Sequence, residues 1–384
     1  MYSAEKRIIE WLKERKYALF IGIISLIGLF IRFENKYFES EDYLIYLSNW
    51  YMEIKNGGGL LALKQQVGNY PAVYQTLIAL FSYLPISPLY AYKGISVIFD
   101  YLLAFEAYRF VKDSCGEKLK ATLSYAIIIL SPIVIMNSAT WGQCDSIYTF
   151  FLICTLHKLH QKRYLSAFVY YGLAFAFKMQ SIFLLPYILY LYIKEEDFSL
   201  IYFLLIPLVI YITYIPAFLF GRSLLDPFAN YLYLAEFSND LCMNVSNLWS
   251  IGNGDYMSMQ YVAMGITLLA LGGVLLYILE KKVSIKEYHL ELAAWSIWTC
   301  VLFLPAMHDR YFYPLEIILI ILICLKHKYL LEYFVMFAAA LQAYCVYLYY
   351  MDVQARWIMG LIVMSTYLYY SYKLFGELKK GGMK

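Results

Sequence analysis

The sequence predicts an all-α, polytopic membrane protein of about twelve transmembrane helices. The chain has 384 residues, of which 62% are hydrophobic and only 15% are charged. Apolar segments of roughly 17–22 residues recur along it, each long enough to cross a hydrocarbon core about 30 Å thick. Helices satisfy their own backbone hydrogen bonds in lipid, whereas an open sheet does not. No stretch has the composition of a separate soluble domain, so residues 1–384 are predicted to form a single membrane domain.

Residues 1–16 form an amphipathic, Lys/Arg-rich lead-in without a small-residue cleavage site. They predict a retained cytoplasmic helix that is followed by a signal-anchor span. The seven cysteines show no CxxC and no paired spacing, and most lie inside apolar segments. This pattern predicts neither a disulfide framework nor a zinc site. The net charge of +3 is small and gives no indication of nucleic-acid binding.

Basic residues gather in short segments between the apolar stretches. The positive-inside rule predicts that these segments are cytoplasmic, so an even number of crossings must separate successive ones. From Lys112 onward the apolar stretches satisfy this requirement. The basic segments are 6–16, 112–120, 157–163, 194–197, 280–286, 326–328 and 373–384. The predicted spans are 17–33, 89–111, 120–137, 144–158, 164–178, 181–194, 199–220, 258–279, 289–305, 311–326, 329–350 and 355–373.

Residues 71–84 are the one apolar piece that breaks this count. The piece is short and ends in Leu-Pro-Ile-Ser-Pro, so we expect it to lie in or dip into the outer leaflet, although the sequence leaves a full crossing open. Both termini are then cytoplasmic. The first outer loop covers about residues 34–88 and includes interfacial helices, and the second large outer loop covers about residues 221–257.

The first outer loop opens with three carboxylates, Glu39, Glu41 and Asp42. Because the chain has so few charged residues, three acids placed together beside a span indicate that at least one of them has a chemical role. Asp42 is our candidate for a general base, with Glu41 or Glu39 nearby. The structural alternative is that these acids start an interfacial helix, where carboxylates suit the N-terminal dipole.

Two further polar corners fall on the same predicted face. Trp141, Gln143 and Asp145 form the first, where a sugar ring could stack on Trp141 and bond to the two polar side chains. Asp145 alone could equally cap the span that follows it. Lys178, with Gln180, forms the second corner; it suits a lipid-linked phosphate, or it snorkels to phospholipid headgroups.

The densest polar island is residues 307–314, with His308, Asp309, Arg310 and Tyr311 in sequence. Arg310 can present a bidentate fork to a phosphate, and His308 can add a donor. These parts suggest sugar transfer from a polyprenyl phosphate. Lys178, His308 and Arg310 would stabilise the departing phosphate, while Asp42 takes the proton of the attacking hydroxyl. A single displacement of this kind inverts the anomeric configuration.

The order of these islands resembles the GT-C superfamily of integral-membrane glycosyltransferases, in its bacterial branch related to the second mannosyltransferase of glycosylphosphatidylinositol assembly. The resemblance rests on the motifs Glu-Asp-Tyr at 41–43, Asn-Tyr-Pro at 69–71, Trp-Gly-Gln-Cys-Asp-Ser at 141–146, Phe-Lys-Met-Gln at 177–180 and Met-His-Asp-Arg-Tyr-Phe at 307–312. It runs from about residue 31 to residue 314, and the last two spans carry no motif of the family.

The resemblance implies an inverting hexosyltransferase of the bacterial plasma membrane that works on the outer face. It implies a polyprenyl-phosphate sugar as donor and a cell-envelope glycan or lipid-linked acceptor. The family's catalytic acid corresponds to Asp42 and its second-loop acid to Asp145, while Asp309 replaces a more usual Glu in the His-acid-Arg-Tyr motif. Whether such acids hold a divalent metal is left open. The expected substrate-binding residues are Glu41, Trp141, Gln143, Asp145, Lys178, Gln180, His308, Asp309, Arg310 and Tyr311.

Two other classes of protein remain open from the sequence. A lipid-linked sugar flippase or other carrier would place ionisable groups along a path through the bilayer, and Asp100, Glu106 and Glu316 are acids inside predicted spans. A membrane acyltransferase would use a buried catalytic His. His308 could serve, but no acid lies at a helical spacing of four from it.

Overall fold

The computed structural model describes residues 3–236, 240–252, 254–281, 284–351 and 356–381. Most of them are helical. The α-helices are α1 (Ser3–Glu34), α2 (Ser48–Asn56), α3 (Ala72–Phe81), α4 (Pro88–Cys115), α5 (Lys118–Leu130), α6 (Pro132–Ile135), α7 (Asp145–His160), α8 (Tyr164–Phe177), α9 (Leu185–Glu195), α10 (Leu205–Leu219), α11 (Asp226–Glu236), α12 (Tyr256–Glu280), α13 (His289–Phe303), α14 (Tyr313–Lys326), α15 (Leu330–Tyr349) and α16 (Arg356–Gly381).

Short π- and 3₁₀-helical segments and two short strands connect these helices. The strands pair in parallel, with Cys242 opposite Met307 and Met243 opposite His308, and so join the second long loop to the polar island before α14. The short elements are η1 (Tyr43–Leu47), η2 (Gly59–Lys64), η3 (Met136–Trp141), η4 (Met179–Leu184), η5 (Leu200–Leu204), η6 (Leu248–Ser250), η7 (Lys286–Tyr288), β1 (Cys242–Met243) and β2 (Met307–His308).

Every predicted span coincides with a helix or a bent pair of helices, so the all-α, polytopic prediction is confirmed. Four helices in the described residues are long and apolar enough to cross a membrane by themselves, in the ranges Ala4–Glu34, Leu200–Leu219, Tyr256–Glu280 and Leu330–Tyr349. A fifth candidate is the pair Lys118–Leu130 and Pro132–Trp141, bent by 47°. The other predicted spans are shorter, broken or more polar helices.

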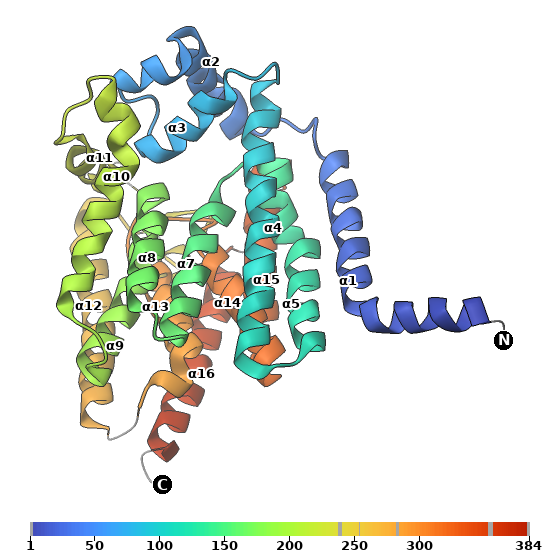
Figure 1. Cartoon of the computed structure of the whole chain (residues 1–384). Helices are drawn as coiled ribbons and strands as arrows, with labels where there is room; N and C mark the ends of the chain where they lie inside the picture. Colours follow the sequence, from blue (N-terminus) through green and yellow to red (C-terminus); the bar gives the residue numbers. More distant parts are fainter. Residues whose placement is uncertain (1–2, 237–239, 253, 282–283, 352–355, 382–384) are drawn as a thin grey trace.

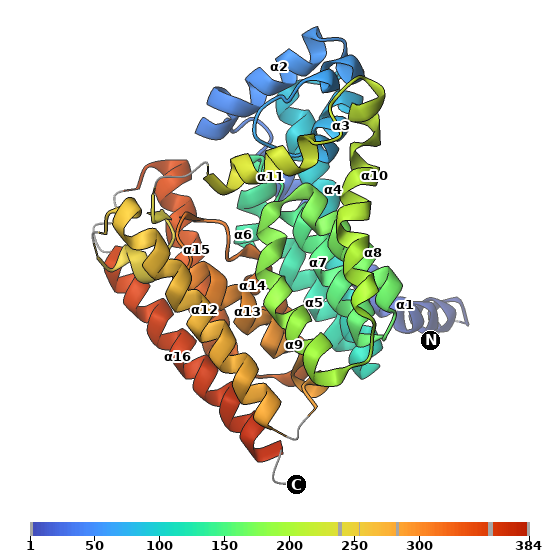
Figure 2. The ribbon, with the colours of Figure 1, turned by 90° about the vertical axis from the view of Figure 1, so that its left-hand side faces the viewer.

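The helices form a bundle with α2 and α3 across one end (Figure 1). Helix α3 corresponds to the short apolar piece at 71–84, and it lies at this end rather than running along the bundle. Helix α11 lies at the same end, beside the top of α10 (Figure 2). The first turns of α1 bend away from the bundle at the opposite end, where α16 also ends (Figure 1). We call the end with α2 and α3 the cap end.

The basic segments gather at the end opposite the cap, as the predicted topology requires. Ion pairs join them there: Lys326 with Glu291 at 2.5 Å, Lys286 with Glu195 at 3.0 Å, and Lys373 with Glu332 at 2.9 Å. Residues 282–283 and 382–384, which belong to two of the predicted segments, lie outside the described residues.

A buried ion pair ties the last turn of α1 to α4. Arg32 Nε lies 2.9 Å from Asp100 Oδ2, and both side chains are almost wholly buried. Ser138 of η3 also donates to this carboxylate, and Arg32 donates to the carbonyl oxygen of Ile129 in α5. Four elements therefore meet around one carboxylate.

We predict that Asp100→Leu and Arg32→Met each destabilise the protein by about 3–5 kcal/mol, because each leaves one buried charge without its partner. The double variant, which removes both charges, should lose less than either single variant. Thermal unfolding in detergent, followed by tryptophan fluorescence, measures this. Equal melting temperatures for the single and double variants would show that the pair does not hold these helices together.

Candidate active site

Asp42 is the residue on which several of the predicted groups converge. Its Oδ2 accepts hydrogen bonds from Trp141 Nε1 at 2.8 Å and from Gln143 Nε2 at 2.6 Å. Its Oδ1 accepts one from the Tyr347 hydroxyl at 2.7 Å. Asp42 lies at the start of η1 but makes no capping hydrogen bond to it. The carboxylate is thus fixed by three donors while the residue stays partly exposed.

The chain that leads from α1 to Asp42 is fastened to its neighbours. The Lys93 ammonium of α4 donates to the carbonyl oxygens of Asn35 at 2.8 Å and Phe38 at 2.6 Å. The Ser40 hydroxyl donates to the carbonyl oxygen of Trp141 at 2.8 Å. These bonds hold the first loop against the Trp141 corner, because Lys93 and Ser40 join backbone oxygens of the loop and of the corner to side chains of the neighbouring segment.

The corner itself is built by a proline and a glycine. Pro132 interrupts the helix after α5, and the chain bends there before it continues through α6 and η3 to Trp141. Gly142 follows with a φ of +83°, which an L side chain rarely adopts. This left-handed turn reverses the chain direction, so Gln143 lies beside Asp42 and Asp145 opens α7.

Asp145 is wholly buried and is surrounded by donors. Asn137 donates to its Oδ2 at 2.9 Å, and Arg310 Nε lies 3.5 Å from the same oxygen. The Lys178 ammonium pairs with its Oδ1. A buried carboxylate is stable only when it is paired and hydrogen-bonded in this way. Two cations share one carboxylate, which leaves a net positive charge for this trio.

Lys178 and Arg310 come from distant parts of the chain and meet over aromatic rings. Lys178 follows α8 with an extended backbone, and its Nζ lies 5.3 Å from the ring centre of Tyr148. Arg310 Cζ lies 5.2 Å from the ring centre of Trp141. The faces of these rings attract cations. Both cationic groups thus meet at Asp145, and the charge of Arg310 also interacts with that of Asp42.

His308 and Asp309 have strongly altered proton affinities. Burial, together with the nearby charges of Arg310 and Lys178, lowers the pKa of His308 to about 3. Burial raises the pKa of Asp309 to about 7; Arg310 opposes that change, and the charges of Asp42 and Asp145 add to it. His308 is therefore neutral at neutral pH, so the expectation that it supplies a third cation is corrected: it can offer only a neutral hydrogen bond.

The structure thus brings most of the predicted residues together at the cap end. Gln180 hydrogen-bonds to the Tyr311 hydroxyl, and the ring of Tyr311 lies 5.2 Å from that of His308. Glu41 is exposed beside Asp42. Trp141, expected as a stacking surface for a sugar, is instead buried and stacks on Tyr347 with ring centres 4.5 Å apart. It holds Asp42 in place, because its ring has little exposed area.

Sequence reasoning missed the contribution of α15, which carried no recognised motif. Its Tyr347 binds Asp42, and its Tyr344 accepts a hydrogen bond from Asn137 at 3.1 Å. The two tyrosines are three residues apart and so share one face of the helix. This spacing of two tyrosines near the end of an otherwise apolar span is the sequence feature that could have indicated a role for α15. Asn137 was a second signal, since it is a polar residue at the end of a predicted span.

Among the described residues, no three His, Cys, Asp or Glu side chains are arranged to hold a metal ion. The donor set agrees with this, because Asp42 is occupied by three hydrogen-bond donors and Asp145 by two cations and an amide. The residues present do not fit a divalent metal.

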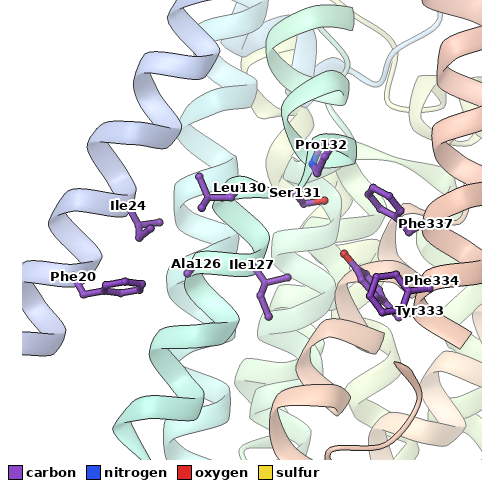
Figure 3. Close-up of a pocket in the computed structure, with 10 residues that line it drawn as sticks. All are labelled: Phe20, Ile24, Ala126, Ile127, Leu130, Ser131, Pro132, Tyr333, Phe334 and Phe337. Atoms are coloured by element: carbon purple, nitrogen blue, oxygen red, sulfur yellow. The ribbon is translucent and has the colours of Figure 1, made fainter. Parts of the chain in front are cut away.

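An open groove of about 390 Å³ lies away from this cluster, between α1, α5 and α15 (Figure 3). Its walls are almost entirely apolar, and no residue of the polar cluster lines it. It suits the hydrocarbon chain of a surrounding lipid. The lining residues are Phe20, Ile24, Ala126, Ile127, Leu130, Ser131, Pro132, Tyr333, Phe334 and Phe337.

Comparison with known proteins relates the central part of this cluster to one family. Residues 138–219 match the family model described as mannosyltransferase (PIG-M). The chain is also similar to GPI mannosyltransferase 1 of Kluyveromyces lactis, with 32% identity over 106 residues. That alignment covers 27% of this chain and 26% of the relative, so the chain spans about a quarter of the curated relative's length. The family match contains Trp141, Gln143, Asp145 and Lys178, whereas Asp42 and Arg310 lie outside it.

We predict that Asp309 makes the stability of the protein depend on pH. The folded state keeps the Asp309 proton up to about pH 7, whereas the unfolded chain loses it near the ordinary value of 3.8. Between these values the folded state binds more protons, so the free energy of unfolding falls as pH rises through this window. Melting temperatures from pH 4 to pH 8 measure the effect.

The matched variant is Asp309→Asn, which removes the titration and keeps the shape of the side chain. Its melting temperature should fall less than that of the wild type over the same range. Parallel curves for the two proteins would contradict a raised pKa of Asp309.

Proposed function

Because the chain is related to the GPI mannosyltransferases of the GT-C superfamily, we propose that it is an inverting glycosyltransferase. It moves a sugar from a polyprenyl-phosphate donor to a cell-envelope glycan or a lipid-linked acceptor. One observation carries the proposal: Asp42 is a partly exposed carboxylate, fixed by three donors, in the same cluster as two cations. This pairing of one base with a positive site for a leaving phosphate is what such a transfer requires.

Asp42 acts as the general base. The acceptor hydroxyl oxygen forms a bond to the anomeric carbon of the donor, and its proton passes to the Asp42 carboxylate. The bond between that carbon and the phosphate oxygen breaks at the same time. The three donors to Asp42 hold its oxygens in one orientation, which favours a single line of attack. A single displacement inverts the configuration at the anomeric carbon.

Lys178 and Arg310 stabilise the phosphate that departs. The polyprenyl phosphate leaves as an anion, and a cationic site lowers the energy of the charge that develops on it. Arg310 offers a planar fork that matches phosphate oxygens, and Lys178 offers a point charge. Their shared partner, Asp145, keeps both cations at the site in the absence of substrate. His308 and Gln180 are the neutral groups that can bond to the donor.

A carrier is the alternative function. It would use ionisable groups within the bundle, but Asp100 is held by Arg32, and Glu106 is held by Arg109 and His157. Glu316 is the exception, because its buried Oε1 has no hydrogen-bond partner among the described residues. A single such group does not form a path across the bundle, so the transferase is favoured. For the acyltransferase alternative, the neutral His308 has no carboxylate bonded to it in the described residues that would orient it as a base.

The proposed setting is the bacterial plasma membrane, with the cap end outside and both termini in the cytoplasm. The support is the collection of basic segments at the end opposite the cap. The first loop at 34–88 and the second at 221–257 are then external. A lipid-linked donor would reach the site from the outer leaflet, and no nucleic acid takes part.

We predict that Asp42→Asn lowers sugar transfer by at least roughly a hundredfold, because it removes the base and keeps the shape of the side chain. Purified membranes supplied with a panel of labelled polyprenyl-phosphate sugars provide the assay. The matched control is Glu53→Gln, an exposed carboxylate of α2 in the same loop, which should keep wild-type transfer. Undiminished transfer by Asp42→Asn would remove Asp42 from the mechanism, and lipid-linked sugar crossing the bilayer without transfer would favour the carrier.

We predict that cysteines introduced at Lys112 and at Lys326 stay unlabelled by a membrane-impermeant maleimide in intact cells. A cysteine at Glu53 should be labelled, since all three positions are exposed but the third lies at the cap end. The background is the chain with its seven native cysteines replaced by serine, and permeabilised cells provide the control for reactivity. External labelling at Lys112 or Lys326 would contradict the proposed orientation.

A further inference from the structure

A strip of aromatic rings leads from the surface of the cap to the base. Tyr46 and Trp50 lie one turn apart, with ring centres separated by 5.7 Å. Trp50 meets Tyr70 edge to face at 5.9 Å. The Tyr70 hydroxyl donates to Gln143 Oε1 at 3.1 Å, and Gln143 in turn donates to Asp42. Each member of the strip therefore contacts the next, and the last one contacts a residue that holds the base.

The strip is held rigidly by the loop beneath it. A Cβ added to Gly68, whose φ is +62°, would lie 2.4 Å from the Trp50 ring, so only glycine lets the backbone approach this closely. The Gln66 amide donates to the carbonyl oxygens of Gly68 at 2.9 Å and Tyr70 at 2.8 Å. Its Oε1 accepts a hydrogen bond from Arg222 at 2.8 Å. Arg222, which is buried, thus fixes the loop from the far side.

This construction differs from that of a membrane anchor. Aromatic residues at a membrane interface need only exposure at the level of the headgroups. Tyr37 is 71% exposed, and among the described residues no series of ring contacts like that of the strip links it to Asp42. Tyr46 is 49% exposed, yet it belongs to a series of contacts that ends at the carboxylate. Tyr and Trp rings in a fixed array offer large, rigid, amphipathic surfaces at little entropic cost.

We infer that the rings of Tyr46, Trp50 and Tyr70 form a binding strip for the hexopyranose rings of a glycan acceptor. The inference rests on the proposed function, because the acceptor hydroxyl must lie against Asp42 when it attacks. The cations of the donor site, Lys178 and Arg310, meet at Asp145 and not on the strip. The inner ring, Tyr70, lies close enough to Arg310 and Asp145 for their charges to interact, and it reaches Asp42 through Gln143. The outer rings of Tyr46 and Trp50 extend away from that point toward the surface and determine which acceptors bind. A sugar ring stacks its apolar face on an aromatic ring and keeps its hydroxyls free for polar contacts.

The test measures oligosaccharide binding directly and does not depend on transfer. The wild-type protein in phosphatidylcholine nanodiscs is titrated with manno- and chito-oligosaccharides of two to four units, and binding is followed by saturation-transfer NMR. The variants are Tyr46→Ser and Trp50→Leu, and the matched control is Tyr37→Ser. We expect saturable binding that weakens by about fivefold to tenfold in each strip variant, the value of one aromatic stacking contact. The control should bind as the wild type does.

Kinetics supply the second readout. With any oligosaccharide that accepts sugar, the strip variants should raise the KM for the acceptor and leave the KM for the donor unchanged. The inference would be overturned if the wild type did not bind oligosaccharides or if all variants bound them equally. A loss confined to Trp50→Leu would also overturn it, because the strip requires the exposed ring of Tyr46 as well. If the proposed function is wrong, the result is different: the wild type consumes no donor although oligosaccharides still bind to it.

Discussion

Charge buried in an apolar bundle is the constraint on which the rest of this structure depends. The chain carries few ionisable groups, and each one removed from water must find a partner or lose its charge. Asp145 is the clearest case, since it is wholly buried and gathers Lys178, Arg310 and Asn137. Helices far apart in sequence are thereby drawn to one point. A positive site near the cap end is the direct consequence, and the proposed function places the phosphate of the donor there.

Asp42, the proposed base, depends on this packing because its hydrogen-bond partners are distant in the chain. The donors to Asp42 lie 99, 101 and 305 residues away. Trp141 and Gln143 reach it only because Pro132 breaks the helix and Gly142 reverses the chain. Tyr347 reaches it only when α15 packs beside that corner. The orientation of the carboxylate is therefore a property of the whole fold, and it holds a residue of a surface loop as firmly as the proposed role of Asp42 requires.

The sequence predicted the helical class and the gathering of polar islands at one end, because hydropathy and basic segments reflect the membrane directly. It predicted the residue types of the cluster for the same reason: charge beside a span is rare. It could not predict which partner each charge takes. The pairing of Lys178 with Asp145 could not be read from the sequence, and the lowered pKa of His308 follows from burial that only the fold creates. Tyr347 was missed because a tyrosine in a span shows no chemistry until a neighbour is placed against it.

The most direct test of the central claim is chemical rescue of Asp42→Gly, which leaves space for a small carboxylate where the base stood. Transfer from a polyprenyl-phosphate sugar is measured with increasing formate, and with chloride at equal ionic strength as the control. We predict that the variant loses transfer by at least roughly a hundredfold and that formate, but not chloride, restores part of it. Transfer by Asp42→Gly near the wild-type rate without formate would contradict the account, because the geometry around Asp42 would then serve structure alone.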